Sequence, residues 1–220
     1  MRLVEIHPDN PQARQVLQVV ELLSKDGVVA YPTSSGYALG CKLSSLRGVE
    51  KIRKIRHLEE KQDFTLMCPS IAVASRYARI DNSTFTFIKS VDAGKFTFLL
   101  TATPELPKKT GSKRKTVGIR IATQQVLVSI IDELGEPLLS TSLLEPLEED
   151  VKKGQKIHTG WSRGLNVQSF SSALDVKDAL GEQIDAVVDS GDVENTPTTV
   201  VDLNGGEFAV IRQGSGVIND

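Results

Sequence analysis

The chain has 220 residues, of which 40% are hydrophobic and 25% are charged, and its formal net charge is −2 at pH 7. These proportions are those of a globular protein, and they exclude a membrane-spanning one, because no apolar run approaches the length of a membrane span. No Pro-, Gly- or Ser-rich linker divides the sequence, so we expect a single domain over residues 1–220.

The first ten residues contain no apolar segment of the kind found in signal peptides. Cys41 and Cys68 both lie in or beside apolar runs, where reduced thiols that pack as small hydrophobes are more common than a disulfide or a metal site. Both features predict a cytoplasmic protein.

The charges are unevenly distributed along the sequence. Residues 1–125 contain 20 Lys and Arg against 11 Asp and Glu, whereas residues 126–220 contain 6 against 17. A basic half would suit a surface that binds nucleotides or nucleic acid, because the local field steers such ligands. The alternative is that the fold mixes the two halves in space, and the sequence leaves both open.

The first elements alternate between strand and helix. A strand is predicted at 3–6. The helix that follows has Asp9 or Asn10 as its N-cap, Pro11 near its first position and Gly27 as its stop.

A predicted strand at 27–32 leads into the stretch AYPTSSGYALGC. Its β-branched density is typical of a buried strand, and Pro32 is expected to end regular pairing because it has no N–H to donate. The strand would then expose the hydroxyls of Thr33 and its neighbours, at the kind of position where α/β folds usually bind ligands. An ordinary Pro-Ser-Gly turn is the alternative.

The next predicted helix, at 44–61, has an apolar stripe made of Val49, Ile52, Ile55 and Leu58, with basic residues on its other faces. The elements predicted after it are a strand at 64–68, helices at 71–77 and 83–91, strands at 95–102 and 116–122, a helix at 123–135 and a strand at 137–142.

Three of these helix ends have recognisable signals. Asp81 or Ser83 is predicted to cap the helix at 83–91, and Thr123 is predicted to cap the helix at 123–135. Gly135 is predicted to end that last helix.

Residues 143–170 show no sustained periodicity, so we interpret them as a long surface insertion. A capped helix is predicted at 171–183, and closing strands at 185–191, 197–203 and 208–214. Strands interleaved with helices indicate an α/β fold, and the neighbouring final strands suggest an antiparallel part.

No familiar catalytic or zinc-binding signature is present, and the three histidines lie far apart in the sequence. What recurs is a polar or basic residue near the end of an apolar strand: Thr33, Arg120, Ser140, Ser142, Thr198, Thr199 and Arg212. A buried arginine must meet a carboxylate or bind an anion, and for Arg120 and Arg212 both outcomes stay open.

Six separated motifs follow one another along the chain: YPTSSGYALGC, KIRKIRHLEEKQDFTLMC, KFTFLLTA, KTVGIRIA, EPLLSTS, and PTTVVDL followed by VIRQG. In this order they resemble the YrdC-like family and, within it, the YciO branch. The resemblance runs from about His7 to Gly216, with an interruption after Ser142. It implies a single-domain, twisted, open, mixed α/β sheet flanked by helices, with a basic concave cavity.

The resemblance also implies nucleotide and RNA binding, and a nucleotidyltransferase activity of the threonylcarbamoyl-AMP synthase type that is linked to tRNA modification. Such enzymes condense L-threonine, bicarbonate and ATP into threonylcarbamoyl-AMP and pyrophosphate. ATP would enter with Mg²⁺ as a substrate complex, with no tightly bound cofactor expected, and no carboxylate pair in the sequence identifies a metal ligand. Arginines and hydroxyls suit this chemistry, which depends on positioning and charge neutralisation.

The resemblance implies roles for individual residues by their position in the motifs. L-threonine would be held by Thr33, Arg120, Ser140 and Thr198. The nucleotide would be bound by Lys54, Arg56, Thr116, Ser142 and Arg212. A surface for RNA or phosphate would be formed by Lys51, Arg53 and Lys61.

Two positions depart from the family pattern. Ser34 stands where the family has an acid after Pro-Thr, and Leu144 stands where it has an asparagine after Ser-x. A lost hydrogen bond to a charged ligand costs roughly 1.5 to 3 kcal/mol. Two hypotheses follow: a synthase-type enzyme, or a non-catalytic protein that binds double-stranded RNA or tRNA, keeps the cavity and has lost adenylation.

Overall fold

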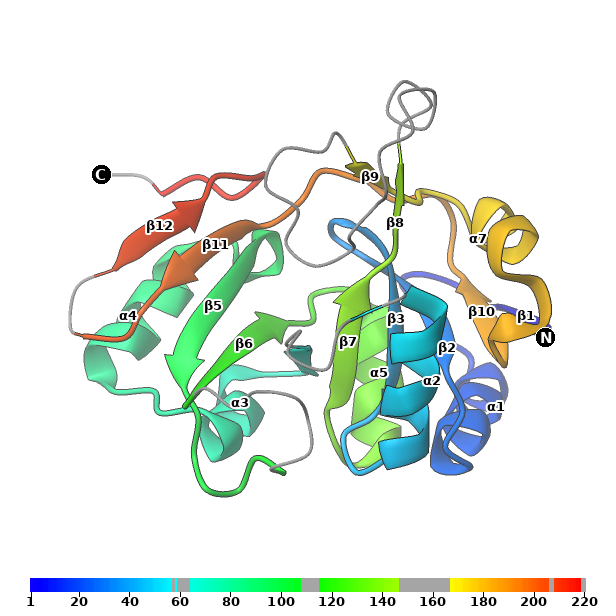
Figure 1. The fold of residues 1–220 in the computed structure, drawn as a ribbon, viewed down its shortest axis with the longest axis horizontal. Helices are drawn as coiled ribbons and strands as arrows, with labels where there is room; N and C mark the ends of the chain where they lie inside the picture. Colours follow the sequence, from blue (N-terminus) through cyan, green and yellow to red (C-terminus); the bar gives the residue numbers. More distant parts are fainter. Residues whose placement is uncertain (57, 59–63, 108–114, 147–166, 206–207, 219–220) are drawn as a thin grey trace.

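A mixed sheet of ten strands forms the centre of the fold (Figure 1). The computed structural model describes residues 1–56, 58, 64–107, 115–146, 167–205 and 208–218. The strands lie across the sheet in the order β1-β10-β2-β3-β7-β4-β6-β5-β11-β12. Their bounds are β1 (Arg2–Glu5), β2 (Val29–Thr33), β3 (Gly36–Lys42), β4 (Thr65–Cys68), β5 (Phe96–Thr101), β6 (Thr116–Ile121), β7 (Leu138–Ser142), β10 (Ala186–Asp189), β11 (Thr199–Asp202) and β12 (Ala209–Arg212).

This sheet contains both parallel and antiparallel pairs of strands. β10 is parallel to both β1 and β2, β4 is parallel to β6, and β11 is parallel to β5. The other neighbours are antiparallel, including the final pair β11 and β12, which confirms the antiparallel part suggested by the sequence. The structure is the open, mixed α/β sheet predicted from the sequence.

Helices cover both faces of the sheet. Their bounds are α1 (Ala13–Ser24), α2 (Leu46–Arg56), α3 (Ile71–Tyr77), α4 (Asn82–Ser90), α5 (Gln125–Leu134) and α7 (Ala173–Leu180), with 3₁₀ turns η1 (Ala93–Lys95) and η2 (Gly181–Gln183). In the described part of the chain, no helix is both long and apolar enough to cross a membrane.

Two hydrophobic cores result from this layering. On one face, Val19 of α1 and Ile130 of α5 pack with sheet residues that include Tyr31. On the other face, Ile52 of α2 and Ile88 of α4 belong to a larger core, to which α3 and α7 also contribute. The apolar stripe predicted for the helix at 44–61 is confirmed, because its residues are buried in or packed against this larger core.

The start of α1 differs from the prediction. The backbone N–H groups of Asp9 and Asn10 both donate to Nδ1 of His7, so these residues form a turn before the helix. The N-cap is Gln12, and it makes no side-chain capping bond. At the other end, α1 stops before the predicted Gly27: its C-cap is Lys25, and Asp26 has the left-handed conformation at φ 63°. Gly27 follows this turn, and its N–H donates to the Leu22 carbonyl at 2.9 Å.

The N-cap of α5 was also predicted wrongly, whereas its C-terminal end was predicted correctly. Its N-cap is Gln124, while Thr123 packs so closely against η1 that a Cβ on Gly94 would lie 2.6 Å from the Thr123 hydroxyl. Gly135 does end α5, in the left-handed conformation at φ 76°.

Pro32 does not end the pairing of β2, contrary to the prediction. It lies within β2 opposite Tyr37. The Tyr37 N–H donates away from β2, to the Phe170 carbonyl, and the Tyr37 carbonyl accepts from Leu143 N. Pro32 therefore faces a position that asks for no ladder hydrogen bond, and its missing N–H costs nothing there.

The segment at 143–170 is more ordered at its ends than the prediction of a surface insertion allowed. Leu143 and Phe170 are buried and bonded to β3, and short strands β8 (Leu144–Pro146) and β9 (Val167–Ser169) pair antiparallel. Residues 147–166 lie outside the described residues.

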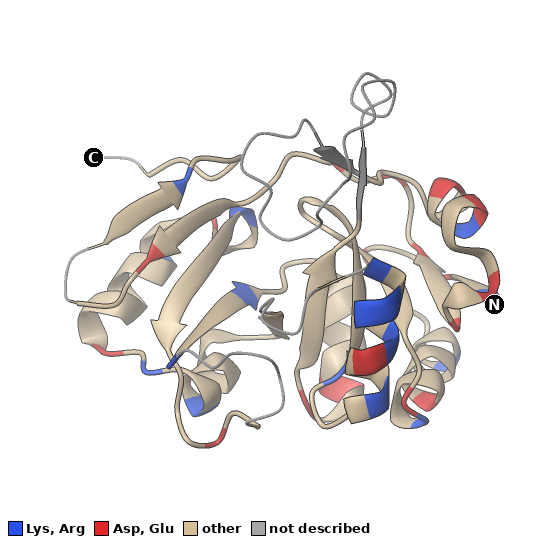
Figure 2. Ribbon diagram, in the orientation of Figure 1, with Lys and Arg blue, Asp and Glu red and all other residues tan. Residues whose placement is uncertain are grey.

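The sheet order also mixes the basic and acidic halves of the sequence. β10, from the acidic half, lies between β1 and β2, while β11 and β12 lie beside β5. Figure 2 accordingly shows blue and red residues interspersed over the ribbon. The second interpretation of the charge asymmetry is therefore the correct one for the backbone arrangement.

Alternation along β5 and β6 separates an apolar face from a polar one. Phe96 and Phe98 lie in the larger core with α4. The register that pairs Phe98 with Ile119 puts Thr97 beside Arg120 on the opposite face. This second face continues the one covered by α1 and α5, but here it presents hydroxyls and a guanidinium.

Candidate functional site

The tip of the β2–β3 hairpin brings three hydroxyl residues together. The Thr33 hydroxyl donates to the Gly36 carbonyl at 2.6 Å, and Thr33 Oγ1 accepts from Ser35 N at 3.2 Å. Ser34 donates to the Gly94 carbonyl of η1. Gly36 has a φ of 90°, which a glycine adopts at little cost, so the turn chemistry fixes these hydroxyls in place.

Arg120 extends from β6 toward this hairpin tip. Its Nη2 lies 3.4 Å from both Thr33 Oγ1 and Ser34 Oγ. The residue is only 5% exposed, and its Nε has no hydrogen-bond partner. Among the described residues, no carboxylate lies within ion-pair distance of this guanidinium. Of the two outcomes left open by the sequence, Arg120 therefore fits the anion-binding one.

Burial lowers the pKa of Arg120 to about 10; Tyr31 opposes this shift and the charge of Arg212 adds to it. The guanidinium remains charged at neutral pH. A buried positive charge that meets only neutral hydroxyls is costly, and an anionic ligand would relieve that cost.

Ser140 lies on the same polar face, in the middle of the sheet. Its hydroxyl oxygen accepts a hydrogen bond from the Tyr31 hydroxyl at 2.7 Å, and its carbonyl accepts from the Thr65 hydroxyl at 3.1 Å. Ser140 is 1% exposed and Tyr31 is 2% exposed. Ser140 thus pairs with Tyr31, and Arg120 with Thr33, on the same face of the sheet; the charge of Arg120 also acts on the Tyr31 pKa.

Thr198 and Arg212 form a second cluster on the outer strands. The hydroxyls of Thr97 and Thr198 lie 2.8 Å apart, and both residues are buried. Arg212 is an exposed residue on β12, and its Nη2 donates to the Thr198 carbonyl at 2.7 Å. This cluster is close to Arg120, because the Arg212 charge acts on the Arg120 pKa and Thr97 lies beside Arg120.

The other predicted nucleotide residues are spread more widely. Thr116 is half-buried opposite Thr101, and Ser142 is exposed at the end of β7, opposite Ala38. On α2, Lys54 is exposed, whereas Arg56 is 5% exposed and burial lowers its pKa to about 10.

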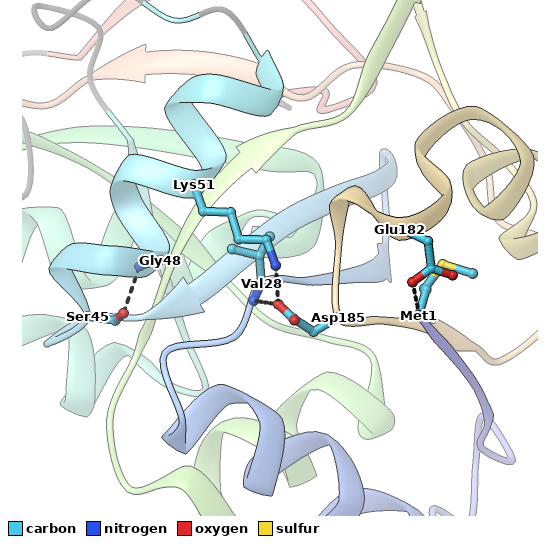
Figure 3. Close-up of polar contacts among 7 residues, drawn as sticks. All are labelled: Met1, Val28, Ser45, Gly48, Lys51, Glu182 and Asp185. Carbon is cyan, nitrogen blue, oxygen red and sulfur yellow. Dashed lines mark hydrogen bonds and ion pairs between the residues drawn. The ribbon is translucent and has the colours of Figure 1, made fainter.

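The basic residues predicted for an RNA surface are partly engaged within the protein. Lys51 Nζ lies 2.6 Å from Asp185 Oδ2, which also accepts from Val28 N at 2.7 Å (Figure 3). The Arg53 guanidinium lies over the Phe64 ring at 5.0 Å. Lys61 lies outside the described residues, and so do the side-chain contacts of Leu144.

Three residues of the site were missed as functional from the sequence: Tyr31, Thr65 and Thr97. The available signal was the alternation itself, since Thr97 lies between Phe96 and Phe98, and Thr65 is the polar residue of an otherwise apolar strand. In the described residues, no group of three or more His, Cys, Asp or Glu could hold a metal ion. The site is therefore a set of arginines and hydroxyls.

A family model described as "Telomere recombination", which joins the Sua5, YciO and YrdC proteins, matches residues 21–167. An uncharacterized protein of Haemophilus influenzae is 42% identical over 96% of this chain and 94% of its own length. The chain belongs to the Sua5/YciO/YrdC family.

Within this family, the chain is similar to YciO proteins over nearly its full length. The uncharacterized protein YciO of Escherichia coli K12 is 39% identical over 96% of this chain and 94% of its own length. The crystal structure of E. coli YciO matches with a TM-score of 0.83, 37% identity, and coverage of 99% of this chain and 98% of that one.

More distant members have names that state an activity or a ligand. A threonylcarbamoyl-AMP synthase of Klebsiella pneumoniae is 25% identical over 61% of this chain and 72% of its own length. The crystal structure of P. abyssi Sua5 complexed with L-threonine shares the fold, with a TM-score of 0.81 at 16% identity, over 97% of this chain and 58% of that one.

Proposed function

We propose that this protein is an enzyme of the threonylcarbamoyl-AMP synthase type, which uses L-threonine, bicarbonate and ATP. The observation that carries the proposal is the buried Arg120, which meets hydroxyls and no carboxylate among the described residues. A distant relative named threonylcarbamoyl-AMP synthase and a Sua5 structure with L-threonine support the choice of substrate.

The threonine carboxylate is the anion that Arg120 would bind, with Ser140 and Thr33 completing its hydrogen bonds. A guanidinium in a dry environment binds a carboxylate strongly, because the charge-assisted bonds are little screened there. Thr198, which directly precedes β11, would contact the same ligand. These residues position the substrate and contribute no covalent nucleophile.

The reaction proceeds in two steps that this arrangement can serve. The threonine amine attacks the carbon of bicarbonate, water leaves, and an N-carboxylate forms. An oxygen of that carboxylate then attacks the α-phosphorus of ATP, and the bond to the β,γ-diphosphate breaks, which releases pyrophosphate. Both steps bring negative charges together, so positive charge and fixed orientation are the main contributions of the protein.

ATP would be bound by Arg212, Thr116, Ser142, Lys54 and Arg56. Arg212 is the best placed of these residues. It is exposed on β12, and it contacts Thr198, one of the residues proposed to bind L-threonine. Mg²⁺ would accompany the triphosphate as part of the substrate.

The second hypothesis, a non-catalytic RNA-binding protein, receives less support. Lys51 and Arg53 on α2 contact Asp185 and Phe64, and Arg56 is buried, so fewer cations of this helix are left to face a phosphate backbone. A buried guanidinium such as Arg120 suits a small ligand better than a duplex.

The test is pyrophosphate release by the purified protein with ATP, Mg²⁺, bicarbonate and L-threonine. Release that requires both threonine and bicarbonate supports the proposal. Absence of release, together with binding of tRNA or double-stranded RNA whose logarithmic affinity falls linearly with the logarithm of salt concentration, would favour the RNA-binding hypothesis. L-serine and D-threonine in place of L-threonine serve as controls for the substrate.

A further inference from the structure

Tyr31 reaches across a whole strand to contact Ser140. Tyr31 lies on β2 and Ser140 on β7, with β3 between them. Gly40 of β3 lies directly opposite Ser140, and a Cβ there would be 2.6 Å from Cε1 of Tyr31 and 3.0 Å from its hydroxyl oxygen. The missing side chain at Gly40 is what lets the ring pass over β3.

The hydroxyls of Tyr31 and Ser140 have two donor protons, and the described part of the chain provides an acceptor for one of them. Tyr31 donates its proton to Ser140 Oγ at 2.7 Å. Within the described residues, the hydroxyl proton of Ser140 has no acceptor of its own. Both residues are almost fully buried, so this donor is left unsatisfied at a cost unless a ligand oxygen accepts it.

Charge defines the kind of ligand oxygen that fits. Burial raises the pKa of Tyr31 well above its ordinary value, with smaller opposing effects from Ser140 and Arg120, so Tyr31 stays a neutral donor. Arg120 is the cation whose charge acts on Tyr31. A proton available at Ser140 and a guanidinium nearby both favour an anionic oxygen.

We propose that Tyr31 is a positioning residue: lying over Gly40, it occupies the acceptor side of the Ser140 hydroxyl and directs the Ser140 proton toward the carboxylate of the substrate. The inference rests on the proposed function, in which that carboxylate is the one of L-threonine. Tyr31 itself touches no substrate and acts through Ser140.

The test uses three variants of the full chain, Tyr31→Phe, Ser140→Ala and the double variant, in the pyrophosphate assay. Y31F keeps the ring over Gly40 and removes only the donor. We expect KM for L-threonine to rise about 3- to 10-fold in Y31F, and about 10-fold or more in S140A, with kcat changed less than KM. In the double variant, Y31F should add no further increase, because its effect passes through Ser140.

Tyr37→Phe is the matched control. Tyr37 is also a fully buried tyrosine, and its hydroxyl donates to the Val188 carbonyl at 3.1 Å, away from Ser140. Y37F therefore loses a buried hydrogen bond of the same kind and should lower the melting temperature about as much as Y31F. Its KM for threonine should equal that of the wild type.

The outcomes separate this inference from the proposed function. If the wild type shows threonine-dependent release and Y31F has the wild-type KM, or if Y31F and S140A effects simply add, the positioning role is wrong and the function stands. If the wild type neither releases pyrophosphate nor binds L-threonine by calorimetry, the proposed function fails and the inference fails with it.

Discussion

Ser34 Oγ accepts from Nη2 of Arg120 at 3.4 Å while its own proton goes to the Gly94 carbonyl. One hydroxyl thus joins the hairpin tip, η1 and the buried guanidinium. Because the Ser34 proton is already used, only its lone pairs face Arg120, and they carry no full charge. The cation is held in position without being neutralised, which leaves its charge for a ligand.

The first prediction concerns Arg120→Met. An uncompensated buried charge opposes folding, so an apolar side chain of similar length should leave the free energy of unfolding unchanged or raise it by about 1 kcal/mol or more. Threonine-dependent pyrophosphate release should disappear. Urea unfolding and the pyrophosphate assay measure the two effects.

Arg76→Met is the control for this variant. Arg76 lies on α3 with its side chain 60% exposed, 3.9 Å from Glu105. R76M should change neither property measurably, since exposed ion pairs contribute little. A strongly destabilised R120M, or one that retains activity, would show that Arg120 has a structural role instead.

Local signals in the sequence account for most helices and strands, and long-range contacts account for what the sequence could not show. The helix at 71–77 was predicted at its observed bounds because helical periodicity depends on residues that are neighbours in sequence. The pairs that build the site are far apart, with Tyr31 and Ser140 separated by 109 residues and Thr97 and Thr198 by 101.

Which distant residues form such pairs depends on the order of the strands in the sheet, and this order cannot be read from a single sequence. The position of β10 between β1 and β2 creates the ion pair between Lys51 and Asp185, so a lysine predicted for an RNA surface has a partner within the protein. The wrong N-cap of α5 has a similar origin, because Thr123 packs against η1, an element that is distant in the sequence. Strand-end arginines and hydroxyls were still found, since their polarity stands out within apolar runs.

The second prediction concerns Arg212→Gln. Because Arg212 is exposed on an outer strand, the free energy of unfolding should change by about 0.5 kcal/mol or less. Loss of a charge-assisted bond to a phosphate should raise KM for ATP about 10-fold or more and weaken its dependence on salt.

Lys89→Gln removes the same charge from α4, which packs on the opposite face of the sheet. Steady-state kinetics with varied ATP at two salt concentrations compare the two variants. Equal KM values in R212Q, K89Q and the wild type would remove Arg212 from the nucleotide site.

The third prediction concerns alkaline pH. Burial raises the pKa of the Cys68 thiol to about 12 from an unfolded value near 9, so the native state retains a proton that the unfolded chain loses. This contribution to stability is complete below pH 9 and is lost as pH rises toward 12. At pH 10.5, one such thiol should cost about 2 kcal/mol relative to pH 8.

Urea unfolding of the wild type and of Cys68→Ala at both pH values, with a reductant present, tests this expectation. Buried Cys41 and the three buried tyrosines keep their own pH dependence in both proteins. C68A should therefore lose about 2 kcal/mol less than the wild type between pH 8 and 10.5. Equal losses would mean that the Cys68 thiol ionises alike in the folded and unfolded states.

The last prediction compares two glycines of the same sheet face. A Cβ at position 40 would meet the Tyr31 ring at 2.6 Å, whereas the nearest atom to a Cβ at position 118 would be the Thr65 methyl, at 3.0 Å. The Tyr31 ring is buried and bonded to Ser140, so it has little room to move. Gly40→Ala should lower the free energy of unfolding by about 1–3 kcal/mol, and more than Gly118→Ala.

Combining Gly40→Ala with Tyr31→Leu isolates the cause. The smaller side chain removes the ring that the new methyl would meet, so adding G40A to Y31L should cost less than adding it to the wild type. Urea unfolding of the four proteins gives this coupling free energy. If G40A costs the same in both backgrounds, the strain at Gly40 lies in the backbone, and the passage of Tyr31 over β3 does not depend on the glycine.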